Sequence, residues 1–204
     1  MIRAKKSLGQ NFLTSESARR KIVEVSQLSS EDTVLEVGPG EGFLTEALLA
    51  TDAKVIAVEK DDRLIEFLQE KFHPQITTKQ LTLIHDDILN FLAASSYHLE
   101  APYKLVANIP YYLTGQIIRQ FLTATNQPQS MTLMLQKEVA NRIVAKGNKE
   151  SLLSISVKAY GTPHHVLTVP RGAFRQIHNV DSAILYIDQI SRGRFINGGV
   201  SEEK

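Results

Sequence analysis

The chain has 204 residues, of which 43% are hydrophobic and 22% are charged, the balance of a globular protein with one core. It contains no cysteine, which excludes disulfide scaffolds, thiolate metal sites, iron–sulfur clusters and cysteine nucleophiles. No apolar run approaches the ~20 residues of a membrane-spanning helix, and no apolar signal core follows the basic start. We therefore expect a cytoplasmic protein without membrane association.

The net charge of +1 conceals an uneven distribution of charge along the chain. Residues 1–23 hold six basic residues and one acidic residue, whereas residues 24–118 hold six basic and fifteen acidic residues. Residues 119–194 are basic again, with ten basic and four acidic residues. Because charge attraction is screened beyond about 10 Å at 0.1 M salt, the basic flanks can meet a polyanion while the acidic middle binds another ligand. If the fold keeps this segregation, the protein has a basic face.

The first half of the chain alternates helical and strand-like patterns. Residues 15–28 are expected to form a helix, because apolar residues recur along one stripe. A strand is predicted at 33–38, a helix at 43–50, a strand at 54–59 and a helix at 61–72.

The second half continues this alternation, which is typical of an α/β domain with a mostly parallel sheet. Strands are predicted at 81–86, 104–109 and 131–136, and helices at 114–123, 137–145 and 152–160. Consecutive Val, Ile and Leu residues favour strands that are covered on both faces. Two further strands, at 164–170 and 180–188, are expected to close a seven-stranded sheet as an antiparallel pair.

A glycine-rich turn follows the first predicted strand, with Gly38, Gly40 and Gly42 spaced as G-x-G-x-G. Glycines let the backbone pass close to a ligand, and the following helix offers unpaired N–H groups, so the turn indicates a nucleotide-like cofactor. The third glycine of the dinucleotide fingerprint would fall on Phe43, which disfavours NAD. An ordinary tight turn between strand and helix is the alternative.

Acidic residues follow the next two strands. Glu59 ends the second strand, 21 residues after Gly38, where a carboxylate can accept both ribose hydroxyls of an adenosine. Asp87, after the third strand, can reach an adenine amino group. Taken singly, Glu59 has a solvated carboxylate at the start of a helix as its alternative, and Asp87 would more often be a helix cap. Their agreement at the carboxyl ends of successive strands, where open α/β sheets bind ligands, predicts a nucleoside cofactor.

The turn after the fourth strand, Asn108-Ile109-Pro110-Tyr111, points to the reaction. The exocyclic N6 of adenine is a poor nucleophile because its lone pair is delocalised into the ring. The Asn108 side-chain oxygen and the Ile109 carbonyl can accept hydrogen bonds from the two N6–H groups and so favour a pyramidal nitrogen. Tyr111 can stack on a flipped base, a contact worth roughly 1–3 kcal/mol. The alternative is a proline-terminated strand followed by a core tyrosine.

With these residues the chain resembles the ribosomal RNA adenine N6-dimethyltransferases, which act on small-subunit (16S) rRNA and share ancestry with the macrolide-resistance Erm enzymes. The resemblance runs from Lys6 to about Ile187, nearly the whole chain. Its motifs are Lys6-Ser7-Leu8-Gly9-Gln10-Asn11-Phe12-Leu13, the glycine turn, Glu59, Asp87, Asn108 to Tyr111, Leu135-Gln136-Lys137-Glu138-Val139-Ala140 and Val180-Asp181-Ser182-Ala183.

The resemblance implies a Rossmann-like class I fold and S-adenosylmethionine as the cofactor. It implies that Asn11 and Leu13 line the methionine end, above Gly38 and Gly40, while Glu59 binds the ribose and Asp87 the adenine. Asn108 is implied to touch both cofactor and target base. Ile109, Pro110 and Tyr111 complete the implied catalytic turn, and Phe174 is the implied second aromatic that sandwiches the base.

The implied reaction is direct transfer of an activated methyl group to N6, which needs alignment and stabilisation of a transient ammonium. It needs no metal, and the six histidines show no metal-ligand spacing. The implied partners are ribosomal RNA and the small ribosomal subunit, and we expect a monomer. Two alternatives stay open: an Erm-type enzyme acting on 23S rRNA, and a non-catalytic ribosome-assembly or RNA-binding factor on the same fold.

The sequence departs from the family pattern in two respects. After Phe174 the family reads F-x-P-x-P, whereas this chain has Gln176 and His178 in place of the prolines, which predicts a less constrained loop. Family members also continue into a small helical domain. We therefore expect a catalytic domain over residues 1–190 and a flexible tail over residues 191–204. The tail lies where the helical domain of the family would begin.

Overall fold

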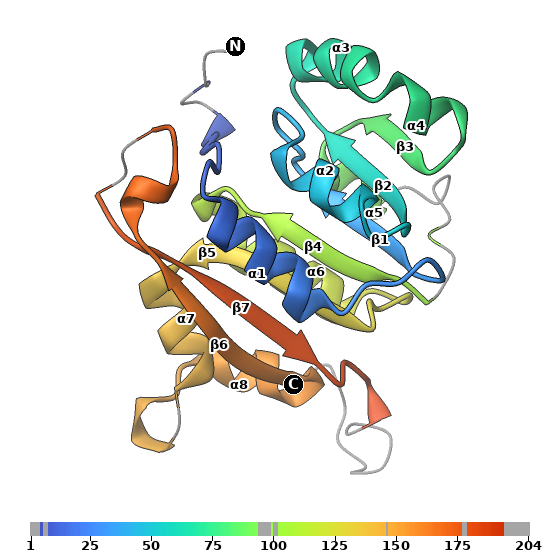
Figure 1. Ribbon diagram of the computed structural model, residues 1–204. Helices are drawn as coiled ribbons and strands as arrows, with labels where there is room; N and C mark the ends of the chain where they lie inside the picture. The colour runs from blue at the N-terminus through green and yellow to red at the C-terminus, as the bar shows by residue number, and fades with distance from the viewer. Residues whose placement is uncertain are drawn as a thin grey trace.

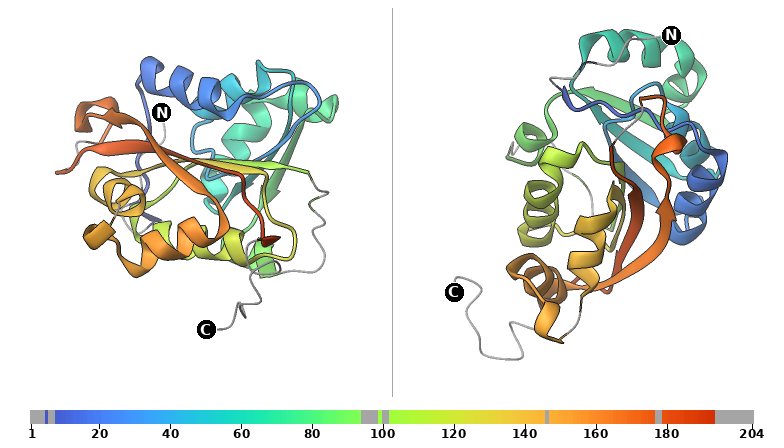
Figure 2. Two further views of the ribbon diagram at one scale, coloured as in Figure 1. Left: turned by 90° about the horizontal axis from the view of Figure 1, so that it is seen from below. Right: turned by 90° about the vertical axis from the view of Figure 1, so that its left-hand side faces the viewer.

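The computed structural model describes residues 5, 8–93, 99, 102–145, 147–176 and 179–193. Most of the predicted tail, residues 194–204, therefore lies outside the described residues, as does His178. The described chain forms one seven-stranded sheet with helices on both faces, and the side views in Figure 2 show the sheet between these two layers.

The sheet has the strand order β3-β2-β1-β4-β5-β7-β6 (Figure 1). Neighbouring strands among β1 to β5 pair in parallel, and β7 runs antiparallel to both β5 and β6. The strands are β1 (Thr33–Val37), β2 (Lys54–Glu59), β3 (Leu81–His85), β4 (Lys104–Asn108), β5 (Ser130–Gln136), β6 (Thr162–Val169) and β7 (Ser182–Asp188). The predicted α/β class, the parallel sheet and the antiparallel final pair are confirmed. The insertion of β7 between β5 and β6 was not predicted.

The helices also lie close to their predicted positions. They are α1 (Glu16–Ser26), α2 (Phe43–Leu49), α3 (Asp62–Lys71), α4 (His73–Thr77), α5 (Ile88–Ala93), α6 (Thr114–Thr123), α7 (Lys137–Val144) and α8 (Leu152–Tyr160). The short helices α4 and α5 were not predicted, because neither is long enough to show helical periodicity. Within the described residues, no helix has the length and apolar character needed to cross a membrane.

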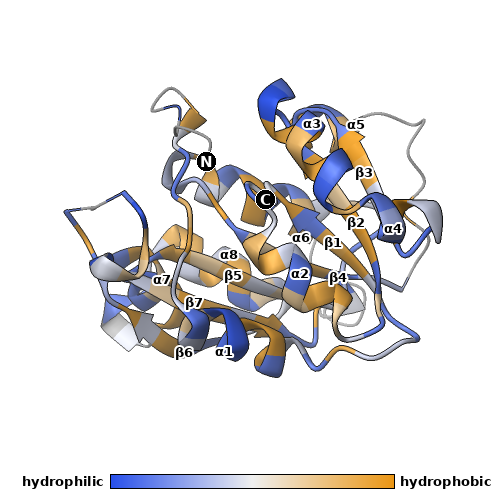
Figure 3. Cartoon of the chain, turned by 45° about the horizontal axis from the view of Figure 1, so that its top comes forward, coloured by the Kyte–Doolittle hydropathy of each residue, from blue (hydrophilic) through white to orange (hydrophobic). Residues whose placement is uncertain are grey.

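Two hydrophobic clusters, one on each face of the sheet, hold the layers together. Alternation along β1 divides its side chains between them: Val34 belongs to the cluster with α1 and α2, and Leu35 to the cluster with α6. In Figure 3 the strands are coloured mainly as hydrophobic and the outer side of α1 mainly as hydrophilic. Both faces of the inner strands β1, β4, β5 and β7 are therefore largely buried, as the Val, Ile and Leu runs predicted, whereas the edge strands β3 and β6 are partly exposed.

The strand order places a crevice at the carboxyl ends of β1 and β4. From β1 the chain proceeds outward to β2 and β3, whereas β4 leads to β5 on the other side. The turns that leave these two adjacent strands diverge, which is where open α/β sheets bind ligands.

Candidate active site

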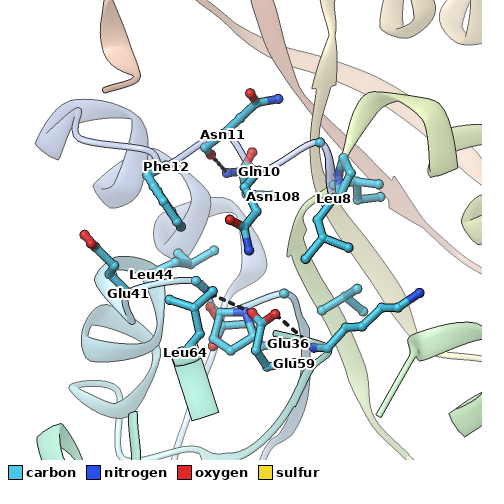
Figure 4. A pocket seen from close by; sticks show the side chains of 18 of the residues that line it. Leu8, Gln10, Asn11, Phe12, Glu36, Glu41, Leu44, Glu59, Leu64 and Asn108 are labelled. Atoms are coloured by element: carbon cyan, nitrogen blue, oxygen red, sulfur yellow. Dashed lines mark hydrogen bonds between the residues drawn. The ribbon is translucent and has the colours of Figure 1, made fainter. Parts of the chain in front are cut away.

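A cavity of about 500 Å³ lies at this crevice, within the range of small-molecule binding sites. Its walls come from residues 8–14 near the N-terminus, the turn after β1, the ends of β2 to β4 and Arg175. All seven predicted cofactor residues line it: Asn11, Leu13, Gly38, Gly40, Glu59, Asp87 and Asn108. Figure 4 shows Asn11, Asn108 and Glu59 around the same space. Residues spread over almost a hundred positions are thus brought together.

The glycine turn keeps one wall of the cavity open. Gly38 has φ of +66°, and a Cβ placed on it would meet nothing within 4 Å. At Gly40, with φ of +60°, a Cβ would lie 3.1 Å from the ring of Phe12. Both positions favour glycine for their backbone conformation, and Gly40 also for the close approach of Phe12.

Glu59 presents a fixed carboxylate to the cavity although it is only 6% exposed. Its Oε1 accepts hydrogen bonds from the backbone N–H groups of Lys60 and Asp61, each 2.9 Å, and its Oε2 accepts one from Gly40, 3.2 Å. Burial raises the pKa of Glu59, and the three backbone hydrogen bonds oppose this effect. The glycine turn and the end of β2 therefore orient this carboxylate together.

A second carboxyl group, Glu36, lines the cavity and was not predicted as a site residue. It is 1% exposed, and its Oε2 accepts a 2.7 Å hydrogen bond from the Thr45 hydroxyl. Burial raises its pKa to about 8, opposed by the Thr45 hydrogen bond and reinforced by the nearby charge of Glu59. The sequence held one signal for this residue: Glu36 is a charged side chain within a buried strand, two residues before Gly38 of the glycine turn.

Asp87 is paired with a lysine at the mouth of the cavity. Its Oδ2 lies 2.7 Å from Lys60 Nζ, and its Oδ1 accepts a 3.0 Å hydrogen bond from the Leu89 backbone N–H. Burial acts to raise the pKa of Asp87, but the hydrogen bonds from Lys60 and Leu89 outweigh it and leave the pKa lowered. The carboxylate is therefore charged, and Lys60 covers one of its oxygens.

The turn after β4 carries two acceptors that no described residue uses. Asn108 Nδ2 donates a 2.8 Å hydrogen bond to the Asn11 carbonyl, and because a carbonyl only accepts, the amide orientation of Asn108 is fixed. Asn108 Oδ1 and the Ile109 carbonyl oxygen receive no hydrogen bond from the described chain, and both residues line the cavity. The two oxygens can accept hydrogen bonds from the two N–H groups of a ligand amine.

The two predicted aromatic residues lie outside the cavity wall. Tyr111 is half-buried, and its hydroxyl forms a 2.7 Å hydrogen bond with the hydroxyl of Ser182. Phe174 is 4% exposed, packs in the hydrophobic cluster on the α1 side and pairs with Leu13 through an isolated β-bridge. Pro110 and Tyr112 do line the cavity, and Tyr112 is 63% exposed. Tyr112 was missed because the motif singles out the preceding tyrosine.

Residues 8–14, here called the N-terminal strap, cross the site. At one end, Asp61 Oδ2 accepts a 2.9 Å hydrogen bond from Gln10 Nε2, and Asp61 Oδ1 lies 3.0 Å from Lys5 Nζ. At the other end, the Thr14 N–H donates to the Ala173 carbonyl at 2.8 Å. These anchors were not predicted, because they join segments far apart in sequence. The described chain contains no group of three or more His, Asp or Glu residues placed to share a metal ion.

A family model described as ribosomal RNA adenine dimethylase matches residues 1–193. The ribosomal RNA small subunit methyltransferase A of Dehalococcoides mccartyi is 50% identical over 186 residues, which cover 91% of this chain and 63% of that protein. The protein of the same name from a Geobacillus species is 41% identical over 187 residues, covering 89% and 63% respectively. This chain thus spans about 63% of the length of these curated relatives.

Solved structures also share this fold. The structure of the 23S rRNA methyltransferase ErmE matches with a TM-score of 0.77 and 29% identity, covering 87% of this chain and 69% of that one. A dimethyladenosine transferase from Plasmodium falciparum matches with a TM-score of 0.78 and 28% identity, covering 91% and 65%. The predicted Rossmann-like methyltransferase fold is confirmed.

Proposed function

We propose that this chain, which belongs to the ribosomal RNA adenine dimethylase family, transfers methyl groups from S-adenosylmethionine to N6 of adenines in small-subunit (16S) rRNA, giving N6,N6-dimethyladenosine. The relatives' names support the small-subunit substrate. The observation that carries the proposal is the pair of unused acceptors, Asn108 Oδ1 and the Ile109 carbonyl, beside a nucleoside-sized cavity. We further propose that residues 1–190 form the catalytic domain of a cytoplasmic monomer.

The residues around the cavity fit S-adenosylmethionine. The open space at Gly38 would accommodate its methionine part, with Asn11 and Leu13 of the strap above it. The fixed carboxylate of Glu59 would accept the ribose hydroxyls, and Asp87 would accept the adenine amino group after releasing Lys60. When bound, this cofactor supplies a sulfonium methyl group that is already activated for transfer.

The chain's own task is then to hold the target amine. Asn108 Oδ1 and the Ile109 carbonyl accept hydrogen bonds from the two N6–H groups. These hydrogen bonds draw the nitrogen toward a pyramidal shape and free its lone pair. Because the strap already fixes the Asn108 amide, little ordering is required at the moment of reaction. The positive charge that develops on N6 is stabilised by the same two oxygens. Because the nitrogen becomes acidic once it is methylated, it releases its proton to water, and no general base is assigned.

The base itself requires an aromatic platform. We assign this role to Tyr111, which lies just outside the cavity wall, directly follows Pro110 of that wall, and is held through its hydroxyl by Ser182. Phe174 would complete the sandwich only after its loop moves, because its ring is buried beside Leu13. Exposed Tyr112, at the cavity wall, offers a further stacking surface.

The proposal is tested by incubating unmodified small-subunit rRNA, or the subunit itself, with protein and S-adenosylmethionine. Nuclease digests analysed by mass spectrometry should contain N6,N6-dimethyladenosine. In Asn108→Ala its rate of formation should fall at least about 100-fold, while Asn90→Ala, an exposed position on α5, should leave it unchanged. Absence of methylated adenine with the unaltered chain would refute the proposal.

The two alternatives give different results in the same assay. An Erm-type enzyme would modify 23S rRNA in preference to 16S rRNA, and the fold match to ErmE favours including that RNA as a parallel substrate. A non-catalytic assembly factor would bind the subunit without transferring methyl groups, and calorimetry would detect no S-adenosylmethionine binding.

A further inference from the structure

The N-terminal strap pairs with the loop formed by residues 170–176, here called the base-side loop, because it carries Phe174. Leu13 and Phe174 form an antiparallel bridge. Thr14 N–H donates to the Ala173 carbonyl at 2.8 Å, and Arg175 N–H donates to the Phe12 carbonyl at 2.9 Å. In a continuing antiparallel ladder the next donor, Phe12 N–H, would bond to the Arg175 carbonyl.

Gln176 supplies a side-chain acceptor at the point where this ladder of backbone hydrogen bonds ends. Its side-chain Oε1 accepts the hydrogen bond of Phe12 N–H at 3.1 Å, across 164 positions of sequence. Gln176 itself is partly buried. The proline that the family pattern carries at this position has no side-chain acceptor, so this contact belongs to the sequence of this chain.

The other end of the same peptide unit holds Asn108. Asn11 C=O and Phe12 N–H belong to one planar peptide group, in which the two bonds point in opposite directions. The C=O accepts the 2.8 Å hydrogen bond from Asn108 Nδ2, and the N–H donates to Gln176 Oε1. A rotation of this plane that breaks one hydrogen bond also turns the other group away from its partner.

We propose that Gln176 is a positioning residue for the methyl-transfer site: by holding the Asn11–Phe12 peptide plane, it fixes the amide of Asn108. Its consequence for catalysis rests on the function proposed above, whereas its effect on Asn108 does not. Neighbouring contacts restrict the position of Phe12, but they do not replace its N–H hydrogen bond to Gln176 Oε1. Phe12 packs its ring at Gly40 and beneath the Arg175 guanidinium, 5.3 Å from the ring centre, and neither contact sets the direction of the peptide plane.

The test compares three variants of the full chain. Gln176→Ala and Gln176→Pro remove the acceptor, and Gln176→Glu retains one. Gln69→Ala, an exposed glutamine on α3, is the matched control. Two quantities are measured without cofactor or RNA: the NMR resonances of the Asn108 side-chain amide and the hydrogen-exchange rate of the Phe12 backbone amide.

Gln176→Ala and Gln176→Pro should shift the Asn108 side-chain resonances and speed Phe12 exchange at least about fivefold, the effect of losing one net hydrogen bond. Gln176→Glu should restore both values and Gln69→Ala should change neither. In the methyl-transfer assay the acceptor-free variants should lower kcat about threefold to tenfold, with rescue by Gln176→Glu.

Faster Phe12 exchange with unchanged Asn108 resonances would overturn the proposal, because it would show that Gln176 acts on the strap alone. Unchanged values of both quantities in Gln176→Ala would overturn it as well. If the unaltered chain transfers no methyl group, the proposed function fails, while the resonance and exchange measurements still decide the role of Gln176.

Discussion

The hydroxyl of Thr45, on α2, donates a 2.7 Å hydrogen bond to the carboxyl group of Glu36 on β1, which lines the cavity at the ends of the strands. Burial raises the pKa of Glu36 to about 8, although the Thr45 hydrogen bond alone would lower it. Between pH 4.5 and about pH 8 the folded protein therefore keeps a proton that the unfolded chain has released. This contribution to stability is complete below the unfolded pKa and is lost as the pH rises through about 8.

Glu36→Gln, which mimics the protonated group, should remove this pH dependence. Urea unfolding between pH 5 and pH 9 would show the unaltered chain losing at least about 1 kcal/mol more than the variant. Glu66→Gln, at an exposed position on α3, serves as the control. Parallel pH profiles for Glu36→Gln and the unaltered chain would contradict the expected titration.

The two glycines of the turn after β1 should respond differently to alanine. Both have positive φ, so each substitution costs roughly 1 kcal/mol of backbone strain. At Gly38 the new methyl group enters open cavity, so S-adenosylmethionine affinity should fall at least about tenfold with little further loss of stability. At Gly40 it meets Phe12 at 3.1 Å, which should lower the melting temperature more than in Gly38→Ala. Calorimetry and thermal unfolding separate the two effects, and equal melting temperatures would contradict the assignment.

Much of this cavity was predictable from local sequence. The positions of Gly38, Glu59, Asp87 and Asn108 follow from one rule, that the carboxyl ends of parallel strands meet at one edge, and all four line the cavity. The strands themselves were marked by Val, Ile and Leu runs that both hydrophobic clusters now bury.

The unpredicted parts depend on contacts between distant segments. The hydrogen bond between Gln176 and Phe12 joins the two ends of the described chain, and Asp61 binds Gln10 across 51 positions. Phe174 carries no local signal that its ring packs in the core, because that burial depends on its pairing with Leu13. Such side-chain contacts follow from the assembled sheet and cannot be read from periodicity or spacing.

Lys60 should compete with the cofactor for Asp87. Its Nζ lies 2.7 Å from Asp87 Oδ2, yet the lysine side chain is 58% exposed, so the pair contributes about 1 kcal/mol or less. Lys60→Ala should therefore tighten S-adenosylmethionine binding only about twofold to fivefold and weaken its dependence on salt. Lys54→Ala, at the opposite end of β2, should change neither quantity. A weaker affinity in Lys60→Ala would show instead that the lysine binds the cofactor.

Asp61 anchors the N-terminal strap. The side chain of Asp61 is fully buried and receives hydrogen bonds from Arg63, Gln10 and Lys5. The Arg63 hydrogen bonds lower the pKa of Asp61 most; burial opposes them, and those from Gln10 and Lys5 add to them. Because the folded pKa lies below the unfolded value of 3.8, the stabilisation is fully present above that value and is lost progressively as the pH falls from there towards the lower folded pKa.

Asp61→Asn should therefore destabilise the protein at pH 7 by roughly 1–3 kcal/mol, since it removes the buried negative charge that pairs with Lys5 and Arg63. It should also flatten the acid limb of the stability profile below about pH 4. Asp52→Asn, in an exposed turn, is the matched control and should follow the unaltered chain. Hydrogen exchange provides the local measurement: if Asp61 anchors the strap, the backbone amides around Gln10 exchange faster in Asp61→Asn and remain protected in Asp52→Asn. An unaltered acid limb in Asp61→Asn would mean that other carboxylates govern acid unfolding.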